Sequence, residues 1–195
     1  MLALIVGLIL FLGLHSVAIV APFWRERMML LVGTGSWKSG YAALSAIGFV
    51  LIVLGFAHAR QIPAVLYTPP GWLRHVSFLL MLPVFPLLLA GYLPGRIQAR
   101  AKHPMLAAVK FWATAHLLAM GTLPDVLLFG SFLIWAVIDR ISLKRRVKLS
   151  PPPHAPASRY NDLIVVVVGL ALYALFLWRL HVLLIGVSPL SPPLG

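Results

Sequence analysis

The sequence predicts an all-α protein, a polytopic transmembrane helical bundle of about six spans. Of the 195 residues, 61% are hydrophobic and 10% are charged, whereas soluble domains are about 45–50% apolar and about 25% charged. The mean hydropathy is +0.97. Several apolar runs reach the roughly 20 residues that a helix needs to cross a hydrocarbon core of about 30 Å. These observations exclude a soluble globular enzyme, and they favour helices over a barrel, whose strands would alternate apolar and polar residues.

Six apolar segments follow one another along the chain. The first, residues 2–21, has no basic stretch before it and no cleavage motif after it, so we expect a retained span rather than a signal peptide. The others are expected at about residues 41–59, 75–93, 104–120, 126–138 and 163–187. The fourth and fifth are short and predict a helical hairpin. Pro83 and Pro86 fall inside the third and predict a kink, whose freed carbonyls neighbouring helices or a cavity would accommodate.

Basic residues lie mostly in the loops that follow the first, third and fifth segments. Of the 16 Lys and Arg residues, only Arg60 and Arg74 lie in the loops of the opposite side. The positive-inside rule therefore predicts that the basic loops are cytoplasmic and that both termini lie outside. The formal charge of +12 is explained by this topology and by attraction to anionic lipid headgroups, so nucleic acid is not an expected partner.

A proline-rich stretch at residues 149–156 separates the last apolar segment from the others. Its prolines prevent a helix there, which predicts a linker. We therefore divide the chain into a transmembrane domain of five helices at residues 1–146, a cytoplasmic linker at residues 147–161, and a C-terminal transmembrane helix with its tail at residues 162–195. The last helix is expected to be an appendage of the first five.

The chain has few of the residues that commonly act in catalysis or bind metals. The chain has no cysteine, which excludes disulfides, thiolate metal sites and cysteine nucleophiles. Its four acidic residues are Glu26, Asp125, Asp139 and Asp162. They are too few for a carboxylate metal cluster or an obvious acid/base pair. We expect Asp125 to form a salt bridge with Arg179 and His181 of the last segment.

Two histidines are the strongest candidates for a site. His15 and His116 lie inside the first and fourth segments, where imidazole is too short to reach the membrane surface. With no thiolate available, two histidines on different helices are what a bundle needs to hold the iron of haem b. The alternative is that each histidine only forms a hydrogen bond with a neighbouring helix. His75, near the outer interface, is the reserve partner for His116.

A second group of polar residues surrounds the start of the fourth segment. His103 and Lys110 are seven residues apart and share one helix face. With Arg100 and Lys102 they predict a face that binds an anion or a lipid headgroup. In the alternative interpretation Lys110 extends to the headgroup region and His103 lies at the interface, with no ligand involved.

Short stretches along the chain resemble motifs of the NnrU family of bacterial membrane proteins. They are Phe11-Leu12-Gly13-Leu14-His15-Ser16, Trp72-Leu73-Arg74-His75, His103-Pro104-Met105, Trp112-Ala113-Thr114-Ala115-His116-Leu117-Leu118-Ala119-Met120-Gly121 and Asp139-Arg140. The resemblance covers residues 1–146 and leaves the last helix outside. It implies a multi-pass protein of the bacterial inner membrane that is associated with nitrite and nitric oxide metabolism.

NnrU proteins are in turn similar to plant 15-cis-zeta-carotene isomerase, a haem b membrane enzyme that isomerises a carotenoid double bond in a redox-dependent way. One iron-binding histidine of that enzyme lies in a His-Ser pair, as His15 does here. The other follows a His-Pro motif by thirteen residues, as His116 follows His103. The resemblance implies haem b with His15 and His116 as axial ligands. Ala113 stands where the plant enzyme has a cysteine proposed to exchange as ligand, so we expect no ligand switching through cysteine.

Three functions remain open at this stage. The first is a haem b protein of nitrogen-oxide metabolism, or a redox-dependent carotenoid cis–trans isomerase-like enzyme acting on a hydrophobic small molecule. The second is a non-catalytic scaffold or assembly factor of a respiratory complex. The third is a membrane methyltransferase that uses S-adenosylmethionine, since a basic residue precedes His103-Pro104 as in isoprenylcysteine carboxyl methyltransferases. The expected partners are the lipid bilayer, a second copy of the chain or a respiratory complex, and no catalytic residue is assigned.

Overall fold

The computed structural model describes residues 1–145 and 155–190. These residues form two compact units. Unit 1 contains residues 1–67 and 122–145, and unit 2 contains residues 68–121 together with the described residues from 155 onward. Every regular element of the described residues is a helix, and Val65 and Thr122 form an isolated β-bridge. The predicted all-α fold is therefore confirmed.

Five helical stretches are long and apolar enough to cross a membrane, which makes the chain a multi-pass membrane protein. They are Leu2–Val20, Thr34–Ala59, Leu73–Ala90, Leu123–Arg145 and Asn161–Ile185. The remaining apolar helix, α7 (Pro104–Ala119), has 16 residues. At 1.5 Å per residue it is about 24 Å long, less than the roughly 30 Å hydrocarbon core. The count of six spans and the side of each terminus therefore stay predictions.

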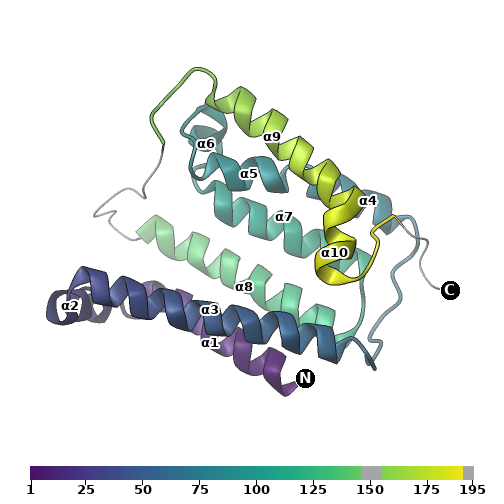
Figure 1. The fold of residues 1–195 in the computed structure, drawn as a ribbon, viewed down its shortest axis with the longest axis horizontal. Coiled ribbons are helices and arrows are strands. Elements are labelled where there is room, and N and C mark those ends of the chain that lie inside the picture. Colours follow the sequence, from purple (N-terminus) through teal and green to yellow (C-terminus); the bar gives the residue numbers. More distant parts are fainter. Residues whose placement is uncertain (146–154, 191–195) are drawn as a thin grey trace. The chain divides into compact units, whose positions relative to one another are not determined.

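Unit 1 is built from four helices. They are α1 (Leu2–Val20), α2 (Pro22–Val32), α3 (Thr34–Ala59) and α8 (Leu123–Arg145). Helix α1 packs along α3 and against α8 (Figure 1). The approach of α1 to α3 is close at Gly7, where a Cβ atom would lie 2.7 Å from the backbone nitrogen of Ile52.

The segment between the first two spans differs from the expectation. The apolar pattern predicted a loop over residues 22–40, but α2 occupies most of it and α3 begins at Thr34, seven residues before the predicted start. Pro22 stands in the first turn of α2, where its missing N–H costs no hydrogen bond. Hydropathy marks only the apolar part of a helix, so it does not detect polar turns that extend the helix beyond the membrane.

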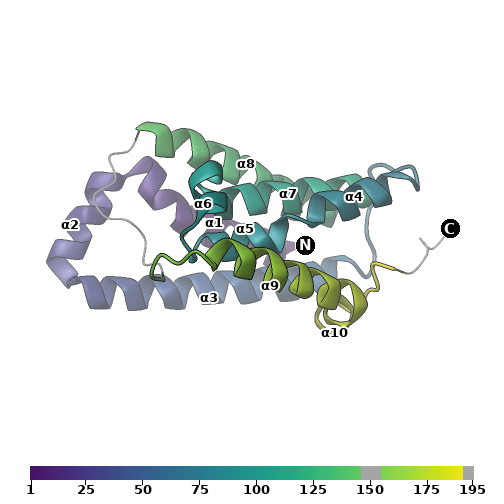
Figure 2. The same ribbon diagram turned by 90° about the horizontal axis from the view of Figure 1, so that it is seen from above.

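Unit 2 contains the remaining described helices. They are α4 (Leu73–Met81), α5 (Val84–Ala90), α6 (Arg96–Ala101), α7 (Pro104–Ala119), α9 (Asn161–Leu175), a π-helical turn (Phe176–Leu180) and α10 (His181–Ile185). Helix α5 packs against α7 on one side and α9 on the other, and α4 packs against α7 (Figures 1 and 2).

The predicted kink separates α4 from α5. Pro83 has no N–H to donate, and the Leu82 N–H donates to the Leu79 carbonyl, three residues earlier, at 3.3 Å. The Phe78 carbonyl instead accepts a hydrogen bond from the Tyr173 hydroxyl of α9 at 2.9 Å. A neighbouring helix thus satisfies a carbonyl at the kink, as the sequence predicted.

Replacing Tyr173 with phenylalanine should lower stability by about 1 kcal/mol, because it leaves the Phe78 carbonyl without its hydroxyl donor. We expect the thermal midpoint in mild detergent, followed by circular dichroism, to fall by roughly 2–4 °C. Tyr92→Phe is the matched control, since the Tyr92 side chain is 55% exposed. Equal midpoints for the two variants would show that the interhelical bond contributes nothing.

The last span belongs to the packed body of unit 2, so the expectation of an appendage was wrong. Gly169 of α9 lies so close to α5 that a Cβ atom would meet the Pro86 nitrogen at 2.6 Å. The Asp162 carboxylate accepts hydrogen bonds from the backbone N–H groups of Arg96 and Ile97 at 2.9 and 3.0 Å. Residues 147–154 of the predicted linker lie outside the described residues.

Candidate functional site

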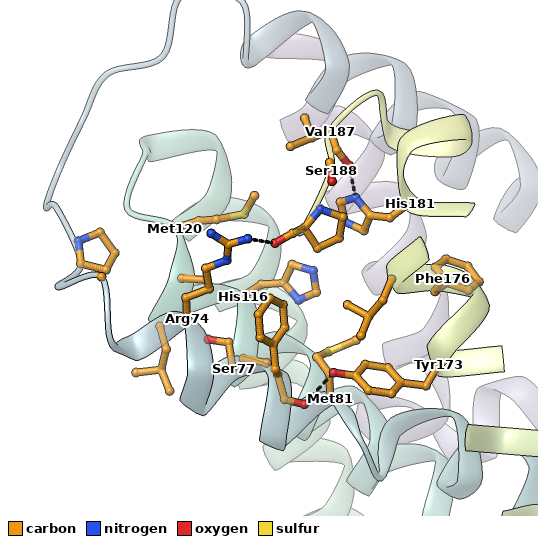
Figure 3. A pocket seen from close by; sticks show the side chains of 18 of the residues that line it. Arg74, Ser77, Met81, His116, Met120, Tyr173, Phe176, His181, Val187 and Ser188 are labelled. Atoms are coloured by element: carbon orange, nitrogen blue, oxygen red, sulfur yellow. Dashed lines mark hydrogen bonds between the residues drawn. The ribbon is translucent and has the colours of Figure 1, made fainter. Parts of the chain in front are cut away.

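A cavity of about 620 Å³ lies within unit 2 (Figure 3). Its walls come from α4, α5, α7, α9, the π-helical turn, α10 and the turn after α10. Most of its lining is apolar. The polar side chains among the lining residues are Arg74, Ser77, His116, Tyr173, His181 and Ser188. A mainly apolar cavity with a few polar groups is typical of a binding site for a small molecule or cofactor.

Irregularities of the last span shape one wall of the cavity. In the π-helical turn the His181 N–H donates to the Phe176 carbonyl, five residues earlier, and such turns are frequent at functional sites. Gly186 then ends α10 with φ 78°, a left-handed conformation that glycine adopts at no steric cost. The chain thereby turns so that Val187 and Pro189 also line the cavity.

His116 is half-buried and lines the cavity from α7. Its Nδ1 lies 2.8 Å from the carbonyl oxygen of Trp112, one turn earlier, and the two rings are in contact with centroids 5.4 Å apart. A carbonyl oxygen only accepts hydrogen bonds, so Nδ1 carries the proton. In the neutral ring Nε2 then carries the lone pair, and this is the form of imidazole that coordinates a metal.

His15 has the same local geometry in unit 1. Its Nδ1 lies 2.7 Å from the carbonyl oxygen of Phe11, again one turn earlier, and the two rings stack with centroids 4.3 Å apart. Tyr41 of α3 and Trp135 of α8 complete an aromatic cluster, with centroids 5.3 and 6.0 Å from the His15 ring. In both predicted ligands the proton is therefore assigned to Nδ1.

The two predicted ligands belong to different units, since His15 lies in unit 1 and His116 in unit 2. A haem held between them stays a prediction. The pattern aromatic-x-x-x-His, found at Phe11/His15 and at Trp112/His116, is visible in the sequence and is the signal of their shared geometry. The reserve ligand His75 is exposed and is not among the residues that line the cavity.

Sequence reasoning did not place His181, Arg74 and Tyr173 in a common site. It assigned His181 to a salt bridge with Asp125. The His181 Nδ1 instead donates to the Val187 carbonyl at 2.6 Å. Tyr173, Leu177 and His181 recur at intervals of four residues, a helical face that was visible in the sequence. The salt bridge stays a prediction, because Asp125 lies in unit 1 and His181 in unit 2. Within unit 1 the Asp125 carboxylate accepts a hydrogen bond from the Thr122 backbone N–H at 3.1 Å.

The predicted anion-binding face also lies in unit 2. Arg100 and Lys102 are exposed, whereas His103 and Lys110 are half-buried. Lys102 has φ 60° and is the centre of a tight turn in which the His103 N–H donates to the Ala101 carbonyl at 2.6 Å. This turn separates α6 from α7 and is a strained conformation for a residue other than glycine. Binding of an anion or headgroup here stays a prediction.

Comparison with known proteins gives one match. The model of a protein family described as "NnrU protein" matches residues 3–189. The match extends beyond residue 146, where the motif resemblance ended, and it includes the last span and the turn that lines the cavity. No curated protein and no solved structure matches the chain.

Proposed function

This chain belongs to the NnrU family, and from that premise we propose that it is a membrane protein that binds haem b, with His116 as one of the residues that would hold the iron. The observation that carries the proposal is the geometry of His116. Its ring lines an apolar cavity, and the hydrogen bond to the Trp112 carbonyl assigns the proton to Nδ1. Nε2 is then the nitrogen that would coordinate iron.

The residues of the cavity fit haem b in three respects. Haem b has a flat apolar body, an iron that accepts imidazole nitrogen, and two propionate carboxylates. The cavity has about 620 Å³ of mainly apolar space, an imidazole from α7, and the guanidinium of Arg74. The aromatic rings of Phe85 and Phe176, whose centroids are 4.8 Å apart, supply part of the apolar wall.

The protein side chains would hold the cofactor and set its surroundings. The Trp112 carbonyl orients His116 and, by accepting a hydrogen bond from Nδ1–H, would make Nε2 a stronger donor to the metal. The apolar wall would surround the flat body of the haem. Bound haem b would supply one-electron chemistry and an iron that can bind nitric oxide. His15 is the second ligand implied by the family resemblance, and His181 is the alternative because it lines the same cavity as His116.

In this proposal the protein acts at the bacterial inner membrane, either in nitrite and nitric oxide metabolism or as a carotenoid isomerase-like enzyme with a hydrophobic substrate. Two other functions are outcomes of the same test. A scaffold of a respiratory complex would purify with its partner and without colour. A methyltransferase would bind S-adenosylmethionine and not haem.

The test is visible spectroscopy of the full chain, expressed with ample haem and purified in mild detergent. Oxidised and dithionite-reduced spectra are recorded for the wild type and for His116→Ala, His15→Ala and His181→Ala. We expect a low-spin b-type spectrum from the wild type, and its loss or conversion to high spin in His116→Ala. Of the other two variants, the one that behaves in the same way identifies the second ligand.

His75→Ala is the matched control, because His75 is exposed and is not one of the lining residues. Its spectrum should equal that of the wild type. A folded but colourless wild type, or a His116→Ala spectrum that does not change, would overturn the proposal. Nitric oxide added to the reduced protein, and a cis-carotenoid substrate, would then separate the two roles of a haem-containing protein.

A further inference from the structure

The cavity of unit 2 carries a single permanent charge on its lining. That charge is the guanidinium of Arg74, in the first part of α4, and no acidic side chain is among the described residues that line the cavity. A cavity with low-polarity walls strengthens the field of such a charge. The electrostatics of the cavity therefore favour a ligand that carries a negative group.

The contacts of Arg74 with the described part of the chain include no negatively charged group. The guanidinium lies over the Phe78 ring, 5.5 Å from the centroid, and Nη2 donates to the backbone carbonyl of Pro189 (Figure 3). An aromatic face and a carbonyl stabilise a cation, but neither carries a negative charge. Arg74 is the second residue of the apolar stretch Leu73–Ala90 and is half-buried, and a charge that is partly removed from water is stabilised by a negative partner.

Among the described residues of unit 2, no acidic side chain lines the cavity to supply a counterion. Asp162 is the one acidic residue in the sequence of unit 2. Its carboxylate accepts the backbone N–H groups of Arg96 and Ile97, at the start of α6. Along α9 it precedes Tyr173, which lines the cavity, by eleven residues, or about 16 Å at 1.5 Å per residue.

We infer that Arg74 binds a carboxylate of the molecule that occupies the cavity. The inference rests on the proposed function, under which that carboxylate is a propionate of haem b. The guanidinium carries five N–H donors in a planar fork that matches a carboxylate, and the bond to Pro189 uses Nη2. His116 would then hold the metal and Arg74 the carboxylate, since both residues line the same cavity.

The test compares two probes that differ only at the carboxylates, haem b and its dimethyl ester. Each is titrated into the haem-free protein in detergent, and binding is followed by the Soret band. We expect the wild type to bind haem b about tenfold more tightly than the ester, the effect of one charge-assisted hydrogen bond. Arg74→Gln should bind haem b about tenfold more weakly and lose the preference. Arg74→Lys should keep part of it, since the charge remains.

Arg60→Gln is the matched control. Arg60 is also half-buried and lies over a phenylalanine four residues away, 5.4 Å from the Phe56 centroid, but it is in unit 1 and does not line the cavity. It should bind both probes as the wild type does. Equal affinity of the wild type for the two probes would overturn the role of Arg74 and leave haem binding intact, whether or not Arg74→Gln folds. A Soret band that neither shifts nor sharpens with either probe when protein is present would overturn the proposed function together with this inference.

Discussion

Gly169→Leu is expected to separate α9 from α5 and to remove one wall of the cavity. A Cβ atom at Gly169 would lie 2.6 Å from the Pro86 nitrogen and 2.7 Å from its Cδ and Cγ atoms. These atoms belong to the backbone and to a closed ring, so they cannot rotate away, and leucine adds three further carbons. We expect a loss of about 3 kcal/mol or more, because overpacking displaces whole helices rather than one side chain.

Cross-linking measures this separation directly. The chain has no native cysteine, so Phe85→Cys and Phe176→Cys introduce the only two thiols, at rings whose centroids are 4.8 Å apart. A short bis-maleimide should join them in the otherwise unchanged protein and fail to do so when Gly169→Leu is added. Gly130→Leu is the control, since nothing lies within 4 Å of a Cβ atom at Gly130. Efficient cross-linking in the Gly169 variant would contradict the close packing of α9 on α5.

The second large effect is expected at Gly7, in the contact between α1 and α3. A Cβ atom there would lie 2.7 Å from the Ile52 nitrogen and 2.9 Å from the Leu51 carbonyl carbon. Small residues allow transmembrane helices to approach closely, and a leucine at such a position forces the backbones apart. We expect Gly7→Leu to lower the thermal midpoint in detergent by on the order of 10 °C.

Gly13→Ala, on the same helix, is a control that should raise stability instead of lowering it. Nothing lies within 4 Å of a Cβ atom at Gly13, so Gly13→Ala should raise stability by about 0.5–1 kcal/mol through helix propensity. The His15 cluster lies further along α1 and includes Tyr41 of α3. Gly7→Leu should therefore also change the near-ultraviolet circular dichroism of these aromatic rings. Equal midpoints for Gly7→Leu and Gly13→Ala would refute the close contact of α1 with α3.

The positions of the long helices were predictable from the sequence because they depend on local composition. The first span was predicted at residues 2–21 and is Leu2–Val20, and the last was predicted at residues 163–187 and is Asn161–Ile185. The kink at Pro83 was predictable for the same reason, since a missing N–H is a property of one residue. Helix ends outside the apolar runs were not predictable, as α2 shows, because hydropathy carries no information about polar turns.

The geometry of the candidate site was less predictable from the sequence than the positions of the long helices. The hydrogen bonds of the His15 and His116 Nδ1 atoms are made to carbonyls one turn earlier in their own helices, whereas the alternative considered from the sequence was a hydrogen bond to a neighbouring helix. The cavity was not predictable from the sequence, because its residues Arg74, His116 and His181 come from three different helices, α4, α7 and α10.

By itself the sequence therefore determined that the chain is a helical membrane protein and where its long helices lie. The tertiary structure alone decided that His116 shares a cavity with Arg74 and His181, and that α9 packs on α5 instead of standing apart. The physical reason is that these contacts depend on close packing between helices, at glycines such as Gly169 and at a carbonyl freed by a kink. No local pattern of residues specifies which helices meet.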